Sequence, residues 1–384
     1  MRIQKYTYAE FSNNIGSWSI DPVVFGQCNL IVGTNSTGKS RLLNTIMNFA
    51  KQIRSGGKIA HSKACFNIVF DDHSGEYEYT LEYKDSSVIK EILKLDNEVL
   101  LERNSDGEGK IFANEIGRMM KFQAPVNEIA VATRQDKIQH PFLEPINKWA
   151  DSLYSYKFGT DMGRVQLAVI DEQNSINEFD THDQDAVVAI SAKGQNEFGQ
   201  EFLEDVTKDM NYIGFDIDSL EIDTPVGIKF NQPVGMAAKA IHVVERGVSA
   251  PIGQIALSQG MFRSISILIH LHYAVRTGNA NTIVIDDIGE GLDYERSCRL
   301  IDCVMKLTND SSVQLIMSTN DRFVMNVVPL ESWTILKRDG DKVSVINKAS
   351  HPDAFADFEF SGLPNFDFFR GATGGNSNFI GDEI

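Results

Sequence analysis

The sequence predicts an α/β fold with a mixed sheet and helices, an antiparallel β arm and an inserted α-helical lobe. Short apolar runs at 27–32 and at the starts of 281–293 and 313–328 are typical of buried strands, and residues 40–53 follow the first of them with helical periodicity. Residues 65–113 alternate with a period of two and break at Ser-Gly and Asp-Gly turns. Such a pattern predicts antiparallel hairpins.

The composition is that of an ordinary globular chain. With 384 residues, 42% of them hydrophobic and 23% charged, the chain is long enough for one large or two modest domains. The first residues lack the apolar stretch of a signal peptide, and the longest apolar run, 264–275, contains His270 and His272 and is too short to span a bilayer. We therefore expect a cytoplasmic protein with no membrane partner.

The acidic charge is concentrated in one part of the chain. The net charge is −17, and residues 171–223 hold fifteen acidic residues against two basic ones. Such a surface repels a nucleic-acid backbone, so direct nucleic-acid binding needs a basic patch elsewhere or a partner protein. A solubilising lobe and a docking site for a basic partner are both compatible with this charge.

The cysteines predict neither disulfides nor zinc. They form no Cys-x-x-Cys pair and have no histidine at a metal-binding spacing. We expect buried, unreactive thiols at Cys28, Cys65, Cys298 and Cys303.

Residues 33–40 read GTNSTGKS and match the pattern G-x-x-x-x-G-K-[ST] in full, between a strand and a helix. Gly33 and Gly38 allow the backbone to curl with its N–H groups inward, Lys39 can reach the β and γ phosphates, and the Ser40 hydroxyl can ligate Mg²⁺. The loop therefore predicts binding of a nucleoside triphosphate. The predicted cofactor-binding residues here are Gly33, Asn35, Ser36, Thr37, Gly38, Lys39, Ser40 and Arg41.

A second strand, far along the chain, ends in two adjacent carboxylates. In NTIVIDD the apolar strand leads to Asp286, which is placed to hold Mg²⁺, and to Asp287, where a water-orienting base would be. An acidic pair at the end of a strand can also cap a turn or helix. With the phosphate loop upstream, we interpret it as a Walker B strand.

Leu-Ser-Gln-Gly at 257–260, followed by a long apolar helix, lies between these two motifs. In this order the sequence resembles the ATP-binding-cassette class of ATPase heads, with ATP and Mg²⁺ as cofactors. The resemblance implies that Ser258, Gln259 and Gly260 begin a helix aimed at the γ-phosphate bound by a second subunit. Ser258 as a simple helix N-cap is the other interpretation.

Two positions depart from that class. The polar switch after the strand at 313 has Asn320 where the family usually has a histidine, and Asp287 replaces the usual catalytic glutamate. Because misplacing a catalytic group by ~1 Å can cost on the order of 10²-fold in rate, we expect slow hydrolysis. Glu290 is the alternative base, and Lys39 completes the predicted catalytic set.

The resemblance also implies a metal-sensing glutamine and a D-loop. Gln135 and Gln139 are the two candidates for the glutamine, with Gln135 preferred as a metal ligand and Arg134 beside them. Leu292 and Asp293 match the D-loop, which in the family lies along the dimer seam.

The resemblance also implies a dimer. The phosphate loop and the Ser258 helix lie on opposite faces of such a fold, so a head with one of each should pair head-to-tail with its own copy around two ATP. A larger ring of such heads is the alternative. Trp149 is expected in the core.

The predicted organisation has four segments. They are an ATPase lobe with phosphate loop and β arm (1–158), an acidic inserted lobe (159–255), the signature helix, Walker B strand and rest of the core (256–348), and a Phe-rich acidic tail (349–384).

The biological role follows from a narrower resemblance. No sustained heptads appear in 160–255, so we expect no coiled-coil arm. A compact head with the run IDDIGEGLDYERS resembles RecF-like and SMC-like ATPases, in particular the ATPase subunits of anti-phage systems such as PARIS, Septu and some retrons. This implies a switch that controls a separate nuclease or toxin. A DNA-repair ATPase and a transporter subunit are the alternatives.

Overall fold

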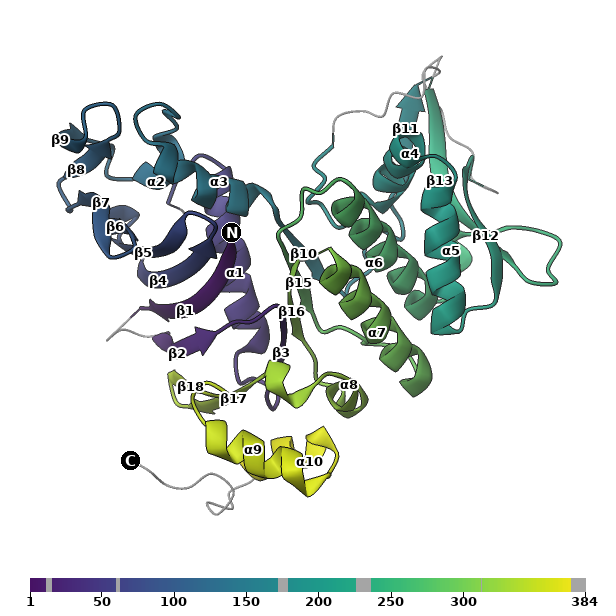
Figure 1. The fold of residues 1–384 in the computed structure, drawn as a ribbon. Coiled ribbons are helices and arrows are strands. Elements are labelled where there is room, and N and C mark those ends of the chain that lie inside the picture. The colour runs from purple at the N-terminus through teal and green to yellow at the C-terminus, as the bar shows by residue number, and fades with distance from the viewer. Residues whose placement is uncertain (12–15, 60–62, 172–178, 226–235, 312, 374–384) are drawn as a thin grey trace. The chain divides into compact units, whose positions relative to one another are not determined.

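The computed structural model describes residues 1–11, 16–59, 63–171, 179–225, 236–311 and 313–373 (Figure 1). The chain divides into two compact units. Unit 1 comprises Met1–Leu153 and Pro329–Ile384, and unit 2 comprises Tyr154–Val328. The predicted segment boundary at 255/256 falls inside unit 2, and part of the acidic stretch and the end of the tail lie outside the described residues.

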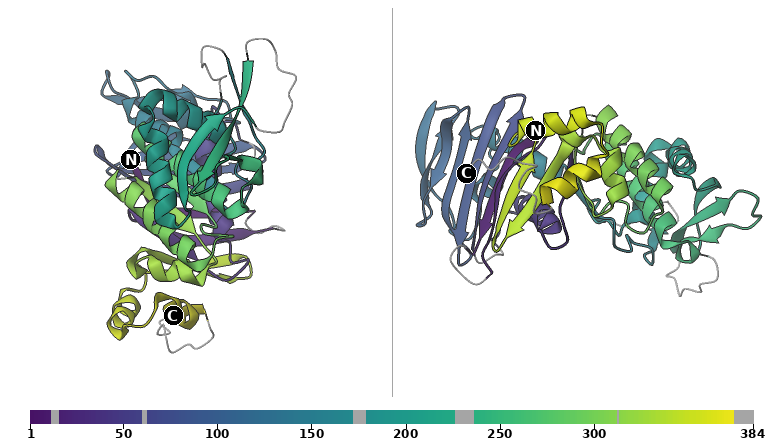
Figure 2. Two further views of the ribbon diagram at one scale, coloured as in Figure 1. Left: turned by 90° about the vertical axis from the view of Figure 1, so that its right-hand side faces the viewer. Right: turned by 90° about the horizontal axis from the view of Figure 1, so that it is seen from below.

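Unit 1 is built on a mixed sheet with the strand order β3-β17-β18-β2-β1-β4-β5-β6-β7-β8-β9 (Figure 2, right). The pairs β3–β17 and β18–β2 are parallel, and the paired neighbours from β2 to β9 are antiparallel. The predicted strand at 27 and the predicted β arm are present, and β17 and β18 form a further antiparallel hairpin that turns at Asp339-Gly340. Their bounds are β1 Arg2–Glu10, β2 Trp18–Val24, β3 Cys28–Val32, β4 Lys63–Asp72, β5 Gly75–Lys84, β6 Ser87–Leu95, β7 Glu98–Arg103, β8 Glu108–Ala113, β9 Arg118–Gln123, β17 Trp333–Asp339 and β18 Lys342–Asn347.

Helices of unit 1 cover the sheet and close its core. The ring of Trp149 lies 6.0 Å from that of Phe49 and 4.9 Å from that of Phe70, and Trp149 is fully buried, so its predicted place in the core is confirmed. Burying these large aromatic side chains stabilises the packing of α1 and α3 on the sheet. The helices are α1 Lys39–Arg54, α2 Ala130–Thr133, η1 Pro141–Leu143, α3 Glu144–Asp151, η3 Leu330–Ser332, α9 Pro352–Ser361 and α10 Asn365–Thr373.

The phenylalanines of the tail pack against one another. Phe368 lies 4.7 Å from Phe355 and 5.0 Å from Phe358, centroid to centroid, and joins α9 to α10. Phe360, in contrast, is 95% exposed. In the described part of the tail, the rings of Phe355, Phe358 and Phe368 therefore bury one another.

Unit 2 contains a short sheet with β10, β15 and β16 side by side, packed with α6 and α7, and a lobe that begins after β10. The strands predicted at 281 and 313 are β15 and β16, and they pair in parallel. Helix α6 is the longest among the described residues, with 18, so no long coiled coil occurs in them. The bounds are β10 Leu153–Lys157, α6 Gln259–Arg276, β15 Thr282–Asp286, α7 Tyr294–Asp310, β16 Gln314–Ser318 and α8 Arg322–Val327.

The inserted lobe is mixed rather than purely helical. Helices α4 and α5 pack on an antiparallel sheet of order β11-β13-β12, with β14 also paired to β13. Its central strand contains Ala237, Ala238 and Ala240. Alanine is depleted in strands, so local propensity gives little sign of this one. The bounds are β11 Ala168–Asp171, α4 Val187–Phe198, α5 Glu201–Ile213, β12 Ile217–Asp223, β13 Met236–Glu245, β14 Ile252–Gly253 and η2 Gln254–Ala256.

Candidate functional site

The loop between β3 and α1 is curled so tightly that glycine is required at both its ends. A Cβ at Gly33 would collide with Thr37 Oγ1, and a Cβ at Gly38 would come within 3.0 Å of the Trp18 ring. Gly38 also has φ = 107°, and Ser36 has φ = 67°. Residues with a Cβ rarely adopt such angles. The two glycines of the sequence pattern are therefore the residues that this loop conformation needs.

Lys39 lies folded into this loop. Its side chain is 5% exposed, and Nζ donates hydrogen bonds to the carbonyls of Gly33 at 2.8 Å and Thr34 at 3.3 Å. The first turn of α1 carries no acidic residue and no side-chain cap. A buried ammonium group beside an uncapped helix start attracts an anion. The cradle therefore fits the phosphates of a nucleotide.

The other predicted loop residues differ in accessibility. Asn35 and Ser36 are exposed and Thr37 is buried. The Arg41 guanidinium pairs with Glu10 and lies 4.8 Å from the centre of the Trp18 ring. For Arg41 to bind a nucleotide as predicted, its guanidinium must either release Glu10 or contact Glu10 and the nucleotide at the same time.

Two residues beside the loop have no counterpart in the sequence motif. Arg338, on β17, donates from Nη1 to the Ser36 carbonyl at 3.2 Å. Trp18, the first residue of β2, packs against Gly38. Both come from parts of the chain remote in sequence, and only the pairing of the strands brings them to the loop.

The acidic strand β15 is fully buried and ends at Asp286, which is 8% exposed. The Ser318 hydroxyl donates to Asp286 Oδ1 at 2.5 Å, and the Asp287 N–H donates to Ser318 Oγ at 2.9 Å. One serine on β16 thus fixes both carboxylate-bearing residues. A buried, oriented carboxylate is a suitable ligand for Mg²⁺.

Asp287 and Asn320, the two departures from the family pattern, lie next to each other. Asn320 Nδ2 donates to Asp287 Oδ1 at 3.2 Å. Asp287 has φ = 54°, a left-handed conformation uncommon for a residue with a side chain. Strained backbone at a strand end is a frequent property of functional positions.

Glu290 lies in a different environment. Its carboxylate packs against the backbone of Gly159, and its carbonyl accepts a hydrogen bond of 3.1 Å from Arg263 Nη1. Arg263 also donates to the carbonyls of Gly159 and Thr160. The turn that carries Glu290 is thus tied to the chain after β10, whereas Asp287 is tied to Asn320.

Ser258 is the N-cap of α6. Its Oγ accepts a hydrogen bond of 3.3 Å from the Met261 N–H, as the capping interpretation requires. Gln259 Nε2 donates to Asp161 Oδ1 at 3.1 Å. Gly260 lies against the predicted D-loop, because a Cβ there would be 2.8 Å from Leu292 Cδ2. The signature turn and the D-loop therefore form one surface of unit 2.

The predicted D-loop ends at Asp293, which caps α7. Its Oδ1 accepts from the Arg296 N–H at 3.0 Å, and this hydrogen bond is the main cause that lowers the pKa of the carboxyl. The carboxylate is thereby kept charged at the start of the helix.

The two candidate glutamines make different contacts. Gln135 is exposed, and its Nε2 donates to the Ala132 carbonyl at 3.1 Å. Gln139 Nε2 donates to Glu115 Oε2 at 2.6 Å, which holds it to the turn between β8 and β9. These contacts favour Gln135 as the residue that can turn toward a metal.

The cysteine thiols have raised pKa values. Burial is the largest cause at each, and it raises the pKa of Cys28 to about 11. Thiols with a raised pKa are poor nucleophiles. Within the described residues no three His, Cys, Asp or Glu side chains are grouped to hold a metal, and no helix is long and apolar enough to cross a membrane.

Neither the family models nor the curated proteins give a match to the sequence. Solved structures do. A Smc head bound to the C-winged helix domain of ScpA aligns with a TM-score of 0.51 and 12% identity, over 90% of this chain and 97% of that one. The chain has the fold of an SMC head.

A second solved structure supports the same conclusion. A Smc head with an extended coiled coil, bound to the C-terminal domain of ScpA derived from Pyrococcus furiosus, aligns with a TM-score of 0.50 and 11% identity, over 93% of this chain and 99% of that one. The SMC-head fold is of the ABC-ATPase type, as the order of the motifs predicts. At this identity the likeness concerns the fold and not the activity.

Proposed function

We propose that the protein is a slow, ABC-type ATPase that works as a nucleotide-timed switch. The observation that carries the proposal is the loop around Lys39, in which a buried ammonium group, two obligatory glycines and an uncapped helix start form a phosphate cradle. This loop occurs on an SMC-head fold together with a buried carboxylate at a strand end and a capped signature helix.

Each residue has a part in the proposed reaction. When bound, Mg²⁺–ATP would supply a γ-phosphoryl group for transfer to water, with ADP as the leaving group. Lys39 would neutralise phosphate charge, Ser40 and Asp286 would hold the metal, and Asp287 would orient the water. Asn320 keeps Asp287 in one orientation, which favours Asp287 over Glu290 as the base.

The proposed working unit is a head-to-tail homodimer around two ATP. A 3₁₀ turn, Gln254–Ala256, precedes the exposed N-cap Ser258, and the first turn of α6 carries no acidic residue, so the positive end of the helix dipole is available to a phosphate from a second copy. The proposed effector is a separate nuclease or toxin subunit, in anti-phage defence. This last step rests on the sequence resemblance alone.

The proposal is tested by ATP hydrolysis and by partner capture. The wild-type protein should release phosphate slowly from ATP, and Lys39→Ala should release none. The protein should co-purify with the product of a neighbouring gene and lower the efficiency of phage plating. Absence of hydrolysis and of ATP binding in the wild type would refute the ATPase, whereas hydrolysis without any plating effect would refute only the defence role.

A DNA-clamping ATPase is the second candidate, favoured by the likeness to SMC heads. It would need a basic surface, and the net charge of −17 opposes it. Filter binding of duplex DNA at low and moderate salt, with and without ATP, separates the two. ATP-dependent retention of DNA at moderate salt would favour the clamp.

A further inference from the structure

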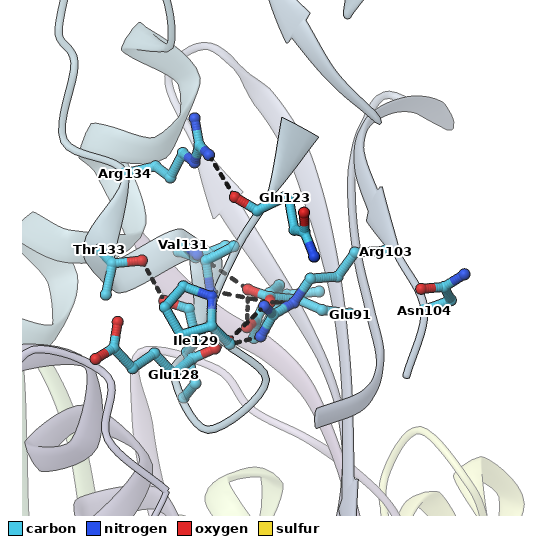
Figure 3. A network of polar contacts seen from close by, with 12 residues as sticks. Glu91, Arg103, Asn104, Gln123, Glu128, Ile129, Val131, Thr133 and Arg134 are labelled. Atoms are coloured by element: carbon cyan, nitrogen blue, oxygen red, sulfur yellow. Dashed lines mark hydrogen bonds and ion pairs between the residues drawn. The ribbon is translucent and has the colours of Figure 1, made fainter. Parts of the chain in front are cut away.

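A fully buried ion pair joins two strands of the β arm in unit 1. Glu91 on β6 and Arg103 on β7 are directly opposite each other in the sheet register. Arg103 Nε lies 2.8 Å from Glu91 Oε2, and both side chains are 0% exposed. Figure 3 shows the pair beside the segment that leads to Arg134.

The pair uses its remaining hydrogen-bonding capacity on that segment. Glu91 accepts from the N–H groups of Ala130 at 3.0 Å and Val131 at 2.9 Å (Figure 3). Arg103 donates to the carbonyls of Pro125, at 3.1 Å, and Glu128. The carboxylate therefore satisfies two N–H groups at the start of α2, and the guanidinium anchors the residues before it.

Helix α2 needs this support. It has four residues and no side-chain cap of its own. A helix of that length is unstable in isolation. The Tyr79 hydroxyl, which donates to Glu91 Oε1 at 2.9 Å, completes the carboxylate's set of donors.

The support extends from α2 to the predicted metal-sensing glutamine. The Arg134 N–H donates to the Ala130 carbonyl at 3.0 Å, and Gln135 Nε2 donates to the Ala132 carbonyl at 3.1 Å. Arg134 Nη2 bonds the Gln123 carbonyl at 3.0 Å, and its guanidinium lies 4.7 Å from the centre of the Phe122 ring. Gln135 therefore directly follows a segment that is bonded to the β arm both before α2, through Arg103, and after it, through Arg134.

Stability alone is a weak reason for such a pair. Apolar residues of similar volume often stabilise a core as well as a buried ion pair does, or better. They cannot, however, accept two N–H groups and donate to two carbonyls. What the ion pair adds is a defined position for residues 125–135.

We propose that Glu91 and Arg103 are positioning residues for Gln135, so that the β arm holds the metal-sensing glutamine in place for ATP hydrolysis. The inference rests on the proposed ATPase function and deepens it. Neither residue touches the nucleotide; both act through α2.

The first test compares Glu91→Gln with Glu78→Gln. Glu78 is on the adjacent strand β5, pairs with Lys94 and is about one-third exposed. Glu91→Gln should lower kcat on the order of 10-fold, leave the KM for ATP unchanged and raise the Mg²⁺ concentration for half-maximal rate. Glu78→Gln should match the wild type. Equal kcat values in all three proteins would overturn the proposal.

The second test does not depend on activity. Hydrogen exchange should speed up at the Ala130, Val131 and Arg134 amides in Glu91→Gln and not in Glu78→Gln. An unchanged exchange rate overturns the positioning proposal even if the wild type hydrolyses no ATP, whereas an inactive wild type with the expected exchange pattern overturns only the proposed function.

A double variant covers the case in which Glu91→Gln fails to fold. Glu91→Leu/Arg103→Met replaces the pair by apolar side chains and removes the acceptors for α2. It should be more stable than Glu91→Gln, because no unpaired charge stays buried, but its kcat should stay below that of the wild type. A wild-type kcat in the double variant would show that the pair is only structural.

Discussion

Asn320 Nδ2 donates a hydrogen bond to Asp287 Oδ1 at 3.2 Å. The two residues that depart from the family pattern thus form one unit. Aspartate is one methylene shorter than the usual glutamate, and a neutral amide replaces the usual histidine. Each change alters the position or strength of the base, and together they account for the slow turnover that we propose.

Restoring both residues should speed hydrolysis. Asp287→Glu/Asn320→His is expected to raise kcat on the order of 10-fold, part of what a ~1 Å misplacement costs. Single-turnover phosphate release measures this. Asp287→Asn is the matched control, since its amide oxygen can still accept from Asn320 while it cannot act as a base, and it should bind ATP without hydrolysing it. A double variant no faster than the wild type would argue against Asp287 as the base.

Lys39→Ala should weaken ATP binding by about 100-fold or more, because the phosphates of ATP would lose the buried ammonium group of the loop. Calorimetric titration with ATP checks this. Lys348→Ala, which removes an exposed lysine paired with Glu331 and Glu359 in the same unit, is the control and should bind normally. Undiminished binding by the Lys39 variant would contradict the assignment of the loop.

Gly33→Ala should distort the loop. Its Cβ would collide with Thr37 Oγ1 and lie 3.0 Å from the Leu336 carbonyl, so ATP affinity should fall at least 10-fold. Gly26→Ala, whose nearest neighbour would be Asn29 Oδ1 at 3.9 Å, is the matched control in the turn before β3. Similar ATP affinities for the two variants would mean that the loop does not need its tight curl.

The stability of unit 2 should fall in mild acid because of His270. Burial, the largest cause, lowers the pKa of His270 from 6.5 to about 4, and its Nε2 donates to the Gln184 carbonyl at 2.9 Å. The folded chain keeps the imidazole neutral, while the unfolded chain takes up a proton near pH 6.5. The stabilisation is therefore complete above pH 6.5 and is lost as the pH falls toward 4, by about 3 kcal/mol in all.

Urea unfolding of the wild type and His270→Leu at pH 7 and pH 5 measures this loss. The variant removes the titrating group and should show a flatter dependence on pH. The same slope in both proteins would show that another group causes the acid sensitivity.

Strong local patterns predicted most of the fold from the sequence. The phosphate loop, β15 and the hairpins of the β arm each carry their own turn residues or an uninterrupted apolar run, so local propensity and tertiary structure agree. The strand β13 was missed because alanine favours helices and is depleted in strands, so its alanines give no strand signal. Arg338 beside Ser36 and the pairing of Asn320 with Asp287 depend on strand neighbours far apart in the sequence, which no local pattern contains.

The proposed dimer predicts opposite effects for two substitutions of Ser258. Ser258→Arg places a long side chain where a partner's γ-phosphate would bind, so it should abolish pairing. Ser258→Ala removes the cap on the Met261 N–H, costs about 1 kcal/mol of helix stability and should still allow pairing. Sizing chromatography with saturating ATP, in an Asp287→Asn background that cannot hydrolyse it, measures both. Because the two variants lose the same cap, a dimer that forms with both would show that this turn does not face a phosphate, and a monomer with the unmodified Ser258 would show that ATP does not join two copies.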